Sequence, residues 1–240
     1  MPILENAKLV TAAFLIAVPI AFNLAFLALA RAFDYPGILR EPPGTILRRF
    51  HAGGPGLLLR WEAFLLTAVA MLPLVALVAG VLAAGPVLTV PSLLIGSAAA
   101  LVQAIGLARW PFAVPELARR YVEADGPDAE ATRRTVEVVF GALHRLLGVG
   151  IGEHLGYLLT GAWTLLTATS VMTTLVLPTW LGLIGLPIGV ALVVGSFEFV
   201  GSNEKDGWAL AGMIVPIAYL AWSAWLIAMG LILLPSAITR

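Results

Sequence analysis

The sequence predicts an all-α polytopic membrane protein, with six transmembrane helices in a single domain that spans residues 1–240. Of the 240 residues, 60% are hydrophobic and only 12% are charged, whereas about 25% of an average soluble domain is charged. The charges also cluster. Four long stretches contain no charged residue, and they lie between Lys8 and Arg31, between Glu62 and Arg109, between Glu153 and Glu198, and between Asp206 and Arg240.

The positions of helix breakers divide these stretches into spans. A helix that crosses a bilayer core of about 30 Å needs about 20 apolar residues, so the four stretches have room for one, two, two and one spans. Gly85-Pro86 divides the second stretch and Pro178 divides the third, as expected for tight turns between spans. The predicted spans lie near residues 9–31, 57–84, 87–110, 155–177, 181–200 and 208–234.

The basic residues predict which side of the membrane each loop faces. Six spans place both termini and the two tight turns on one side, where only Lys8 and Arg240 lie. Cytoplasmic loops carry an excess of Lys and Arg, so we expect the other side to be cytoplasmic and both termini to be outside. That side carries Arg31, Arg40, Arg48, Arg49, Arg60, Arg109, Arg119, Arg120, Arg133, Arg134, Arg145 and Lys205.

Each of the two longer cytoplasmic connectors is predicted to contain an interfacial amphipathic helix. In the first connector Thr45 is expected to cap a short helix, with apolar residues on one face and Arg48 and Arg49 on another. In the second connector apolar residues recur at helical spacing. The two predicted apolar faces consist of Ile46, Leu47 and Phe50, and of Val136, Val139, Phe140, Leu143 and Leu147.

Three motifs carry a resemblance to a known family: FDYPGILREP at 33–42, ALHRLLGVGIGEHLGYLLTGAW at 142–163 and FEFVGSNEKDGWALAG at 197–212. With these motifs the chain resembles a family of bacterial integral membrane proteins of unknown function. The resemblance implies the six-span fold and a bacterial source, hence a multi-pass protein of the cytoplasmic (inner) membrane. It contributes no activity and no catalytic residue.

Within the membrane the sequence places polar side chains but no charged ones. They could line a polar cavity, although packing between helices explains small hydroxylated residues more often. Prolines inside four spans are expected to kink them. The candidate cavity-lining residues are Asn23, Gln103, Thr160, Thr164 and Thr167.

Ionisable residues gather at the cytoplasmic ends of the spans, where a closed bundle would bring them into a ring. Such a ring could bind a ligand, or its members could form ion pairs that anchor the helix ends. Glu198 in particular would need a partner such as Arg109 or Arg31, or would be protonated. The candidate ligand-binding residues are Glu62, Arg109, Glu153, His154, Glu198 and Arg31.

The three histidines His51, His144 and His154 are the metal or haem candidates. Their spacing matches no metal-binding motif, and the chain has no cysteine, so the sequence requires no cofactor. Sequence motifs for nucleotide binding or nucleophilic catalysis are also lacking, and no catalytic residue is predicted. A net charge near zero gives no sign of nucleic-acid binding.

Three functions remain open. The first is a small-molecule binder or transporter with a polar cytoplasmic mouth. The second is a non-catalytic accessory or sensory subunit that docks a protein partner through its cytoplasmic connectors. The third is a haem- or metal-binding membrane protein. The sequence favours a protein that is not an enzyme, and the kinked helices and hydroxyl groups favour the first function slightly over the second.

Overall fold

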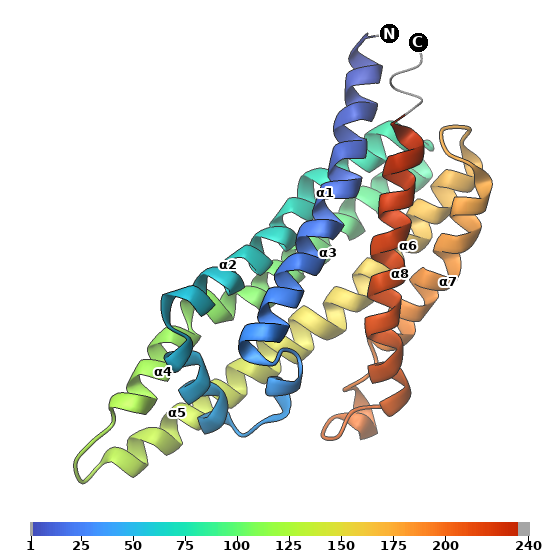
Figure 1. Cartoon of the computed structure of the whole chain (residues 1–240). Coiled ribbons are helices and arrows are strands. Elements are labelled where there is room, and N and C mark those ends of the chain that lie inside the picture. The colour runs from blue at the N-terminus through green and yellow to red at the C-terminus, as the bar shows by residue number, and fades with distance from the viewer. Residues whose placement is uncertain (1, 235–240) are drawn as a thin grey trace.

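The computed structural model describes residues 2–234, which are largely helical and contain no strand (Figure 1). The six long helices are α1 (Pro2–Phe33), α2 (Pro43–Leu82), α3 (Pro86–Phe112), α6 (Gly156–Thr173), α7 (Thr179–Gly195) and α8 (Ala209–Leu233). The shorter elements are η1 (Gly37–Arg40), α4 (Val114–Glu123), α5 (Ala129–Leu143), the π-helix η2 (His144–Leu155) and η3 (Gly201–Asn203).

The six long helices form a closed ring. Each packs against the next one along the chain, and α8 packs against α1 to close it. The turns at 83–85 and 174–178 lie at one end of the ring, which we call the turn end (Figure 1). The segments 34–42, 124–128 and 196–208 lie toward the other end, which we call the connector end (Figure 1).

Several helices are suited to a lipid bilayer. By length and composition, five helical stretches of the described chain can cross a membrane, whereas α7 is apolar but only 17 residues long. The predicted fifth span at 181–200 extends beyond the C-terminal end of this helix. The helix stops at Gly195, and a looped segment follows in which Gly201 and Gly207 have positive φ angles of 65° and 77°. The apolar helices indicate a membrane protein.

The predicted cap of the first connector is wrong. The helix begins at Pro43 with Pro42 as its N-cap, and Thr45 makes no capping bond. Proline suits the first helical position because its φ angle is already helical and because an N–H group at that position would have no partner within the helix. The same helix continues into the second span across a kink at Gly54, where φ is 54° and ψ is −156°.

Only part of the apolar stripe predicted for the second connector is buried. On α5, Val136 and Phe140 are buried, whereas Val139 is exposed. The α-helical spacing ends at Leu143, because the chain continues as the π-helix η2. A π-helix has a different number of residues per turn, so the stripe predicted from α-helical spacing does not extend to Leu147.

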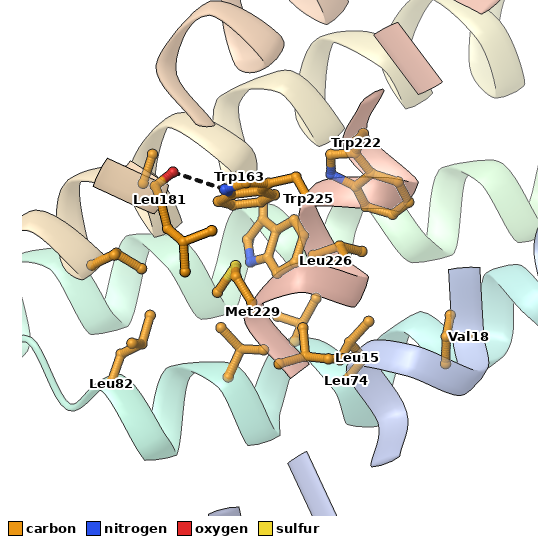
Figure 2. Packing of buried hydrophobic residues seen from close by; sticks show 14 of the residues in the cluster. Leu15, Val18, Leu74, Leu82, Trp163, Leu181, Trp222, Trp225, Leu226 and Met229 are labelled. Atoms are coloured by element: carbon orange, nitrogen blue, oxygen red, sulfur yellow. Dashed lines mark hydrogen bonds between the residues drawn. The ribbon is translucent and has the colours of Figure 1, made fainter. Parts of the chain in front are cut away.

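Apolar side chains fill the ring on the side of the turn end. Figure 2 shows Leu15 of α1, Leu74 of α2, Trp163 of α6 and Trp222 of α8 in one cluster. Trp225 of α8 joins them, and its Nε1–H donates a hydrogen bond of 2.8 Å to the Leu181 carbonyl of α7. Large buried aromatic rings therefore occupy the middle of this half of the bundle.

A second buried cluster lies at the connector end and is dominated by aromatic rings. Trp61 of α2 and Trp110 of α3 stack with a centroid distance of 4.3 Å and an interplanar angle of 8°. Phe33 at the end of α1 contacts both rings edge-on, at 6.1 and 5.6 Å. This cluster fixes the ends of three helices, and with them the chain segments that border the candidate site.

Candidate ligand-binding site

Glycine residues bring η2 against α3. A Cβ atom on Gly106 of α3 would lie only 2.6 Å from the Cα atom of Gly152 of η2. Small residues let two helix backbones approach this closely. π-helical turns occur often at functional sites, and here the close contact sets the position of Glu153 and His154, the next two residues of η2.

A pocket of about 450 Å³ lies between η2 and the end of α7 with the loop that follows it. Its walls combine apolar side chains with several ionisable ones. The apolar side chains come from Ala142, Leu146, Val149, Phe199 and Val200, and the polar ones from Arg145, Glu153, His154, Tyr157, Ser196 and Glu198.

The backbone of the loop after α7 holds His154 in place. The Nδ1 atom of His154 lies 2.7 Å from the carbonyl oxygen of Ser196. Because a carbonyl can only accept, Nδ1 carries the proton and donates. The ring also contacts Phe197 edge-on at 5.7 Å. In the neutral imidazole Nε2 is therefore left as an acceptor.

Glu198 has a partner that the sequence did not predict. Its Oε1 atom lies 3.7 Å from Nη2 of Arg40, whereas Arg109 and Arg31 were the expected partners. The Glu198 side chain is 14% exposed and the Arg40 side chain is 79% exposed. Burial raises the pKa of the Glu198 carboxyl above its ordinary value, and the charge of Arg40 opposes this shift.

Arg109 is buried, with 6% of the residue exposed, and does not line the pocket. Its Nη1 donates to the Gly106 carbonyl, and its guanidinium lies over the Trp110 ring at 5.2 Å. A Cβ atom on Gly148 would lie 2.7 Å from Nη2, so the glycine leaves room for the guanidinium in its present position. The charge of Arg109 acts on Glu153 through space, but Glu153 forms no hydrogen bond or ion pair with any residue in the described range 2–234.

A family model described as a domain of unknown function (DUF4386) matches residues 10–230. The chain belongs to the DUF4386 family. The match confirms the resemblance to an uncharacterised family and includes every residue that lines the pocket. No curated protein and no solved structure matches the chain.

In this DUF4386 member the six candidate ligand-binding residues have different positions. Glu153, His154 and Glu198 line the pocket, whereas Arg109 does not line it and lies against Gly148. Glu62 is half-buried on α2 and Arg31 is exposed at the end of α1, and neither lines the pocket. The structure thus brings three of the six together around one space.

The five candidate cavity-lining residues lie between helices, and none of them lines this pocket. Asn23 donates to the Pro19 carbonyl at 2.7 Å and to Ser223 Oγ at 2.9 Å. Gln103 donates to Thr160 Oγ1 at 2.8 Å, so the two amides bond to separate partners. Thr164 Oγ1 accepts from Trp222 Nε1 at 3.0 Å, and Thr167 is fully buried.

The three histidines lie in three different environments. His51 is exposed on α2, His144 stacks on Phe140 at 5.6 Å within the aromatic cluster, and His154 lines the pocket. Over the described part of the chain, no three His, Asp or Glu side chains are grouped so that they could hold a metal ion. The described histidines therefore belong to no such group of three ligands.

Sequence reasoning missed Arg40 and Arg145 as part of the site. Arg145 lines the pocket and pairs with Glu204, with 2.8 Å between Nη2 and Oε1, while also donating to the Glu204 carbonyl. Both arginines pair with acids of the segment 196–208 from distant parts of the chain. The only signal available was their place within the motifs FDYPGILREP and ALHRLLGVGIGEHLGYLLTGAW.

Proposed function

We propose that this protein binds a small molecule in the pocket between η2 and α7, at the cytoplasmic side of a bacterial inner membrane. The observation that carries the proposal is the pocket itself. It has a volume of about 450 Å³, which is in the range of small-molecule sites. It combines apolar walls with the carboxylate of Glu153, which has no ion-pair partner among residues 2–234.

The proposed orientation rests on six spans, with α7 as the fifth. Its 17 residues are at the lower limit for a helix that crosses a bilayer. The ring supports a crossing, because α7 packs along both α6 and α8. The basic residues of the connector end then place this end in the cytoplasm and both termini outside.

Binding is proposed without transport. The cluster of Trp163, Trp222 and Leu74 fills the ring on the side of the turn end, and the pocket lining includes none of the three. In the described structure the pocket therefore lies to one side of the packed half.

Native mass spectrometry of the gently purified full chain tests the proposal. We expect a retained small-molecule mass in the wild type and its loss in Val149→Trp, because an indole at Val149 fills the pocket. The control is Val138→Trp, which adds the same ring at an exposed position of α5 and keeps the ligand. A wild type without any adduct, or an adduct that survives Val149→Trp, contradicts the proposal.

A further inference from the structure

We propose that the ligand is an amine, whose ammonium group binds between Glu153 and Glu198 while its apolar part packs against Leu146, Val149 and Phe199. This inference rests on the proposed function, because it assigns a ligand class to the same pocket. It follows from the balance of charges around the pocket and from the distribution of apolar side chains in its wall.

The charge left unpaired in the pocket is negative. Arg145 is already bound through Nη2 to the side chain and the carbonyl of Glu204, so the carboxylate of Glu204 compensates its charge. Glu153 has no ion-pair partner within the described chain, and the charge of Arg109, which does not line the pocket, acts on it only through space. Among residues 2–234 Glu198 is paired only with the exposed Arg40, at 3.7 Å, and exposed partners contribute little. A cation that entered the pocket would thus meet two carboxylates, while Arg109 lies outside the lining and Arg145 is paired with Glu204.

The shape of the site favours an organic cation over a metal ion. Glu153, His154 and Glu198 line the same pocket, but they are not grouped closely enough to hold a metal ion. His154 also uses Nδ1 to bind the Ser196 carbonyl. An ammonium group has three donors and can bridge carboxylates that are further apart, and the pocket of about 450 Å³ has room for an attached carbon chain.

The position of the pocket allows two sources for such an amine. Glu153 precedes the end of α6 at Thr173 by about 30 Å of helix at 1.5 Å per residue, which is about one hydrocarbon thickness. The pocket therefore lies at the level of the lipid headgroups in the proposed orientation. The ammonium group can belong to a lipid headgroup or to a free amphiphilic amine.

The test is calorimetric titration of the full chain in phosphatidylcholine nanodiscs with hexylammonium, and with hexanol and hexanoate as matched compounds. We expect hexylammonium to bind most tightly. Glu153→Gln and Glu198→Gln should each weaken its binding about 10-fold or more, because each removes a charge-assisted hydrogen bond. Glu123→Gln is the control, since Glu123 is an exposed partner of Arg119 outside the pocket. The melting temperature of each variant shows that it is folded.

Equal binding of hexanol or hexanoate overturns the inference, and so does unchanged binding of hexylammonium by both Gln variants. If that binding is still lost in Val149→Trp, the pocket stands and only the ligand class is wrong. If none of the three compounds binds the wild type, the amine inference also fails, and the native mass spectrum decides the proposed function separately.

The lipid composition of the nanodiscs distinguishes the two sources. Phosphatidylethanolamine carries a primary ammonium, whereas the quaternary ammonium of phosphatidylcholine has no N–H to donate. If added phosphatidylethanolamine raises the apparent Kd of hexylammonium, the natural ligand is a lipid headgroup. An unchanged Kd assigns the site to a free amine, and both results keep the chemistry proposed here.

Discussion

Nη2 of Arg40 lies 3.7 Å from Oε1 of Glu198, and this ion pair links the connector after α1 to the segment after α7. The two partners differ in exposure, with Arg40 in solvent and Glu198 mostly buried. An exposed arginine at this distance contributes little stability, and burial raises the pKa of the Glu198 carboxyl. Keeping Glu198 ionised is therefore unfavourable for folding, as is often found for residues retained for binding.

The first prediction concerns pH. Because the pKa of Glu198 is higher in the folded chain than its ordinary value of 4.5, the folded state binds this proton more tightly. The stabilisation that the folded chain gains from this tighter proton binding is complete below about pH 4.5 and is lost as pH rises through the folded pKa. Glu198→Gln should therefore be at least as stable as the wild type at about pH 8, and its stability should depend less on pH.

Thermal unfolding at about pH 5 and about pH 8 measures this difference. Glu123→Gln, which loses an exposed carboxylate on α4, controls for the change in net charge and should follow the wild type. A lower melting temperature of Glu198→Gln at the higher pH would show that the pair with Arg40 outweighs the effect of burial. The other charged or titratable groups around Glu198, which are Arg40, Arg145, Glu153 and His154, remain in all of these proteins.

The second prediction concerns the contact between α3 and η2. Gly106→Ala should destabilise the fold by about 1–3 kcal/mol, because its Cβ would lie 2.6 Å from the Cα atom of Gly152 and 2.8 Å from the Leu147 carbonyl. Both are backbone atoms and cannot move without shifting η2. Gly80→Ala is the matched control in α2, where the added Cβ meets nothing within 4 Å.

The control should gain about 0.4–1 kcal/mol, because alanine has less conformational freedom than glycine in the unfolded chain. The two free energies of unfolding, measured side by side with denaturant, should therefore change in opposite directions. If Gly106→Ala is as stable as Gly80→Ala, the backbones of α3 and η2 are not in close contact.

The third prediction concerns the stacked indoles. Trp110 is fully buried, and its ring stacks on Trp61 at 4.3 Å. Trp110→Ala should lower the free energy of unfolding by about 3–5 kcal/mol, because it removes a large side chain from a packed cluster. Trp180→Ala, at a site that is 49% exposed, should change it by about 0.5 kcal/mol or less. Equal losses in the two variants would contradict the packing of the aromatic cluster.

Local sequence signals were sufficient for much of the fold. The breaks at Gly85-Pro86 and Pro178 were predicted because proline and glycine interrupt a helix whatever surrounds them, and α3 and α7 begin at Pro86 and Thr179. The alternating glycines 148, 150 and 152 before Glu153 are typical of a close approach between backbones, and Gly152 does lie against Gly106. Such signals depend only on neighbours in the chain.

Partnerships between distant residues left no such signal. Asn23 bonds to Ser223, 200 positions away, and Gln103 to Thr160, 57 positions away. Each amide could bond to any polar group at the same depth in the bundle, so its partner depends on the order of the helices around the ring. For the same reason Arg40 was missed as the partner of Glu198. The π-helix was also unpredicted, because apolar spacing alone does not separate it from an α-helix.

The last prediction concerns the topology and decides whether α7 crosses the membrane. The chain has no cysteine, so a single introduced cysteine reports one position. Leu175 lies in the exposed turn before α7, and Lys205 lies in the exposed segment after it. If α7 is a span, then Leu175→Cys in intact spheroplasts should react with a membrane-impermeant maleimide, whereas Lys205→Cys should react only after lysis. Asp125→Cys, in the turn between α4 and α5, should behave like Lys205→Cys because both lie at the connector end.

Each pattern of labelling has one structural meaning. Reaction of Leu175→Cys and Lys205→Cys from the same side would show that α7 does not cross and that the chain has five spans. Reaction of the two variants from opposite sides, with Lys205→Cys accessible from outside, would keep six spans but invert the orientation. The twelve basic residues expected in the cytoplasm would then lie outside. The pocket would then open outside the cell, because Glu153 and Glu198 lie at the same end of the ring as Lys205. The labelling therefore also determines from which side a ligand reaches the site.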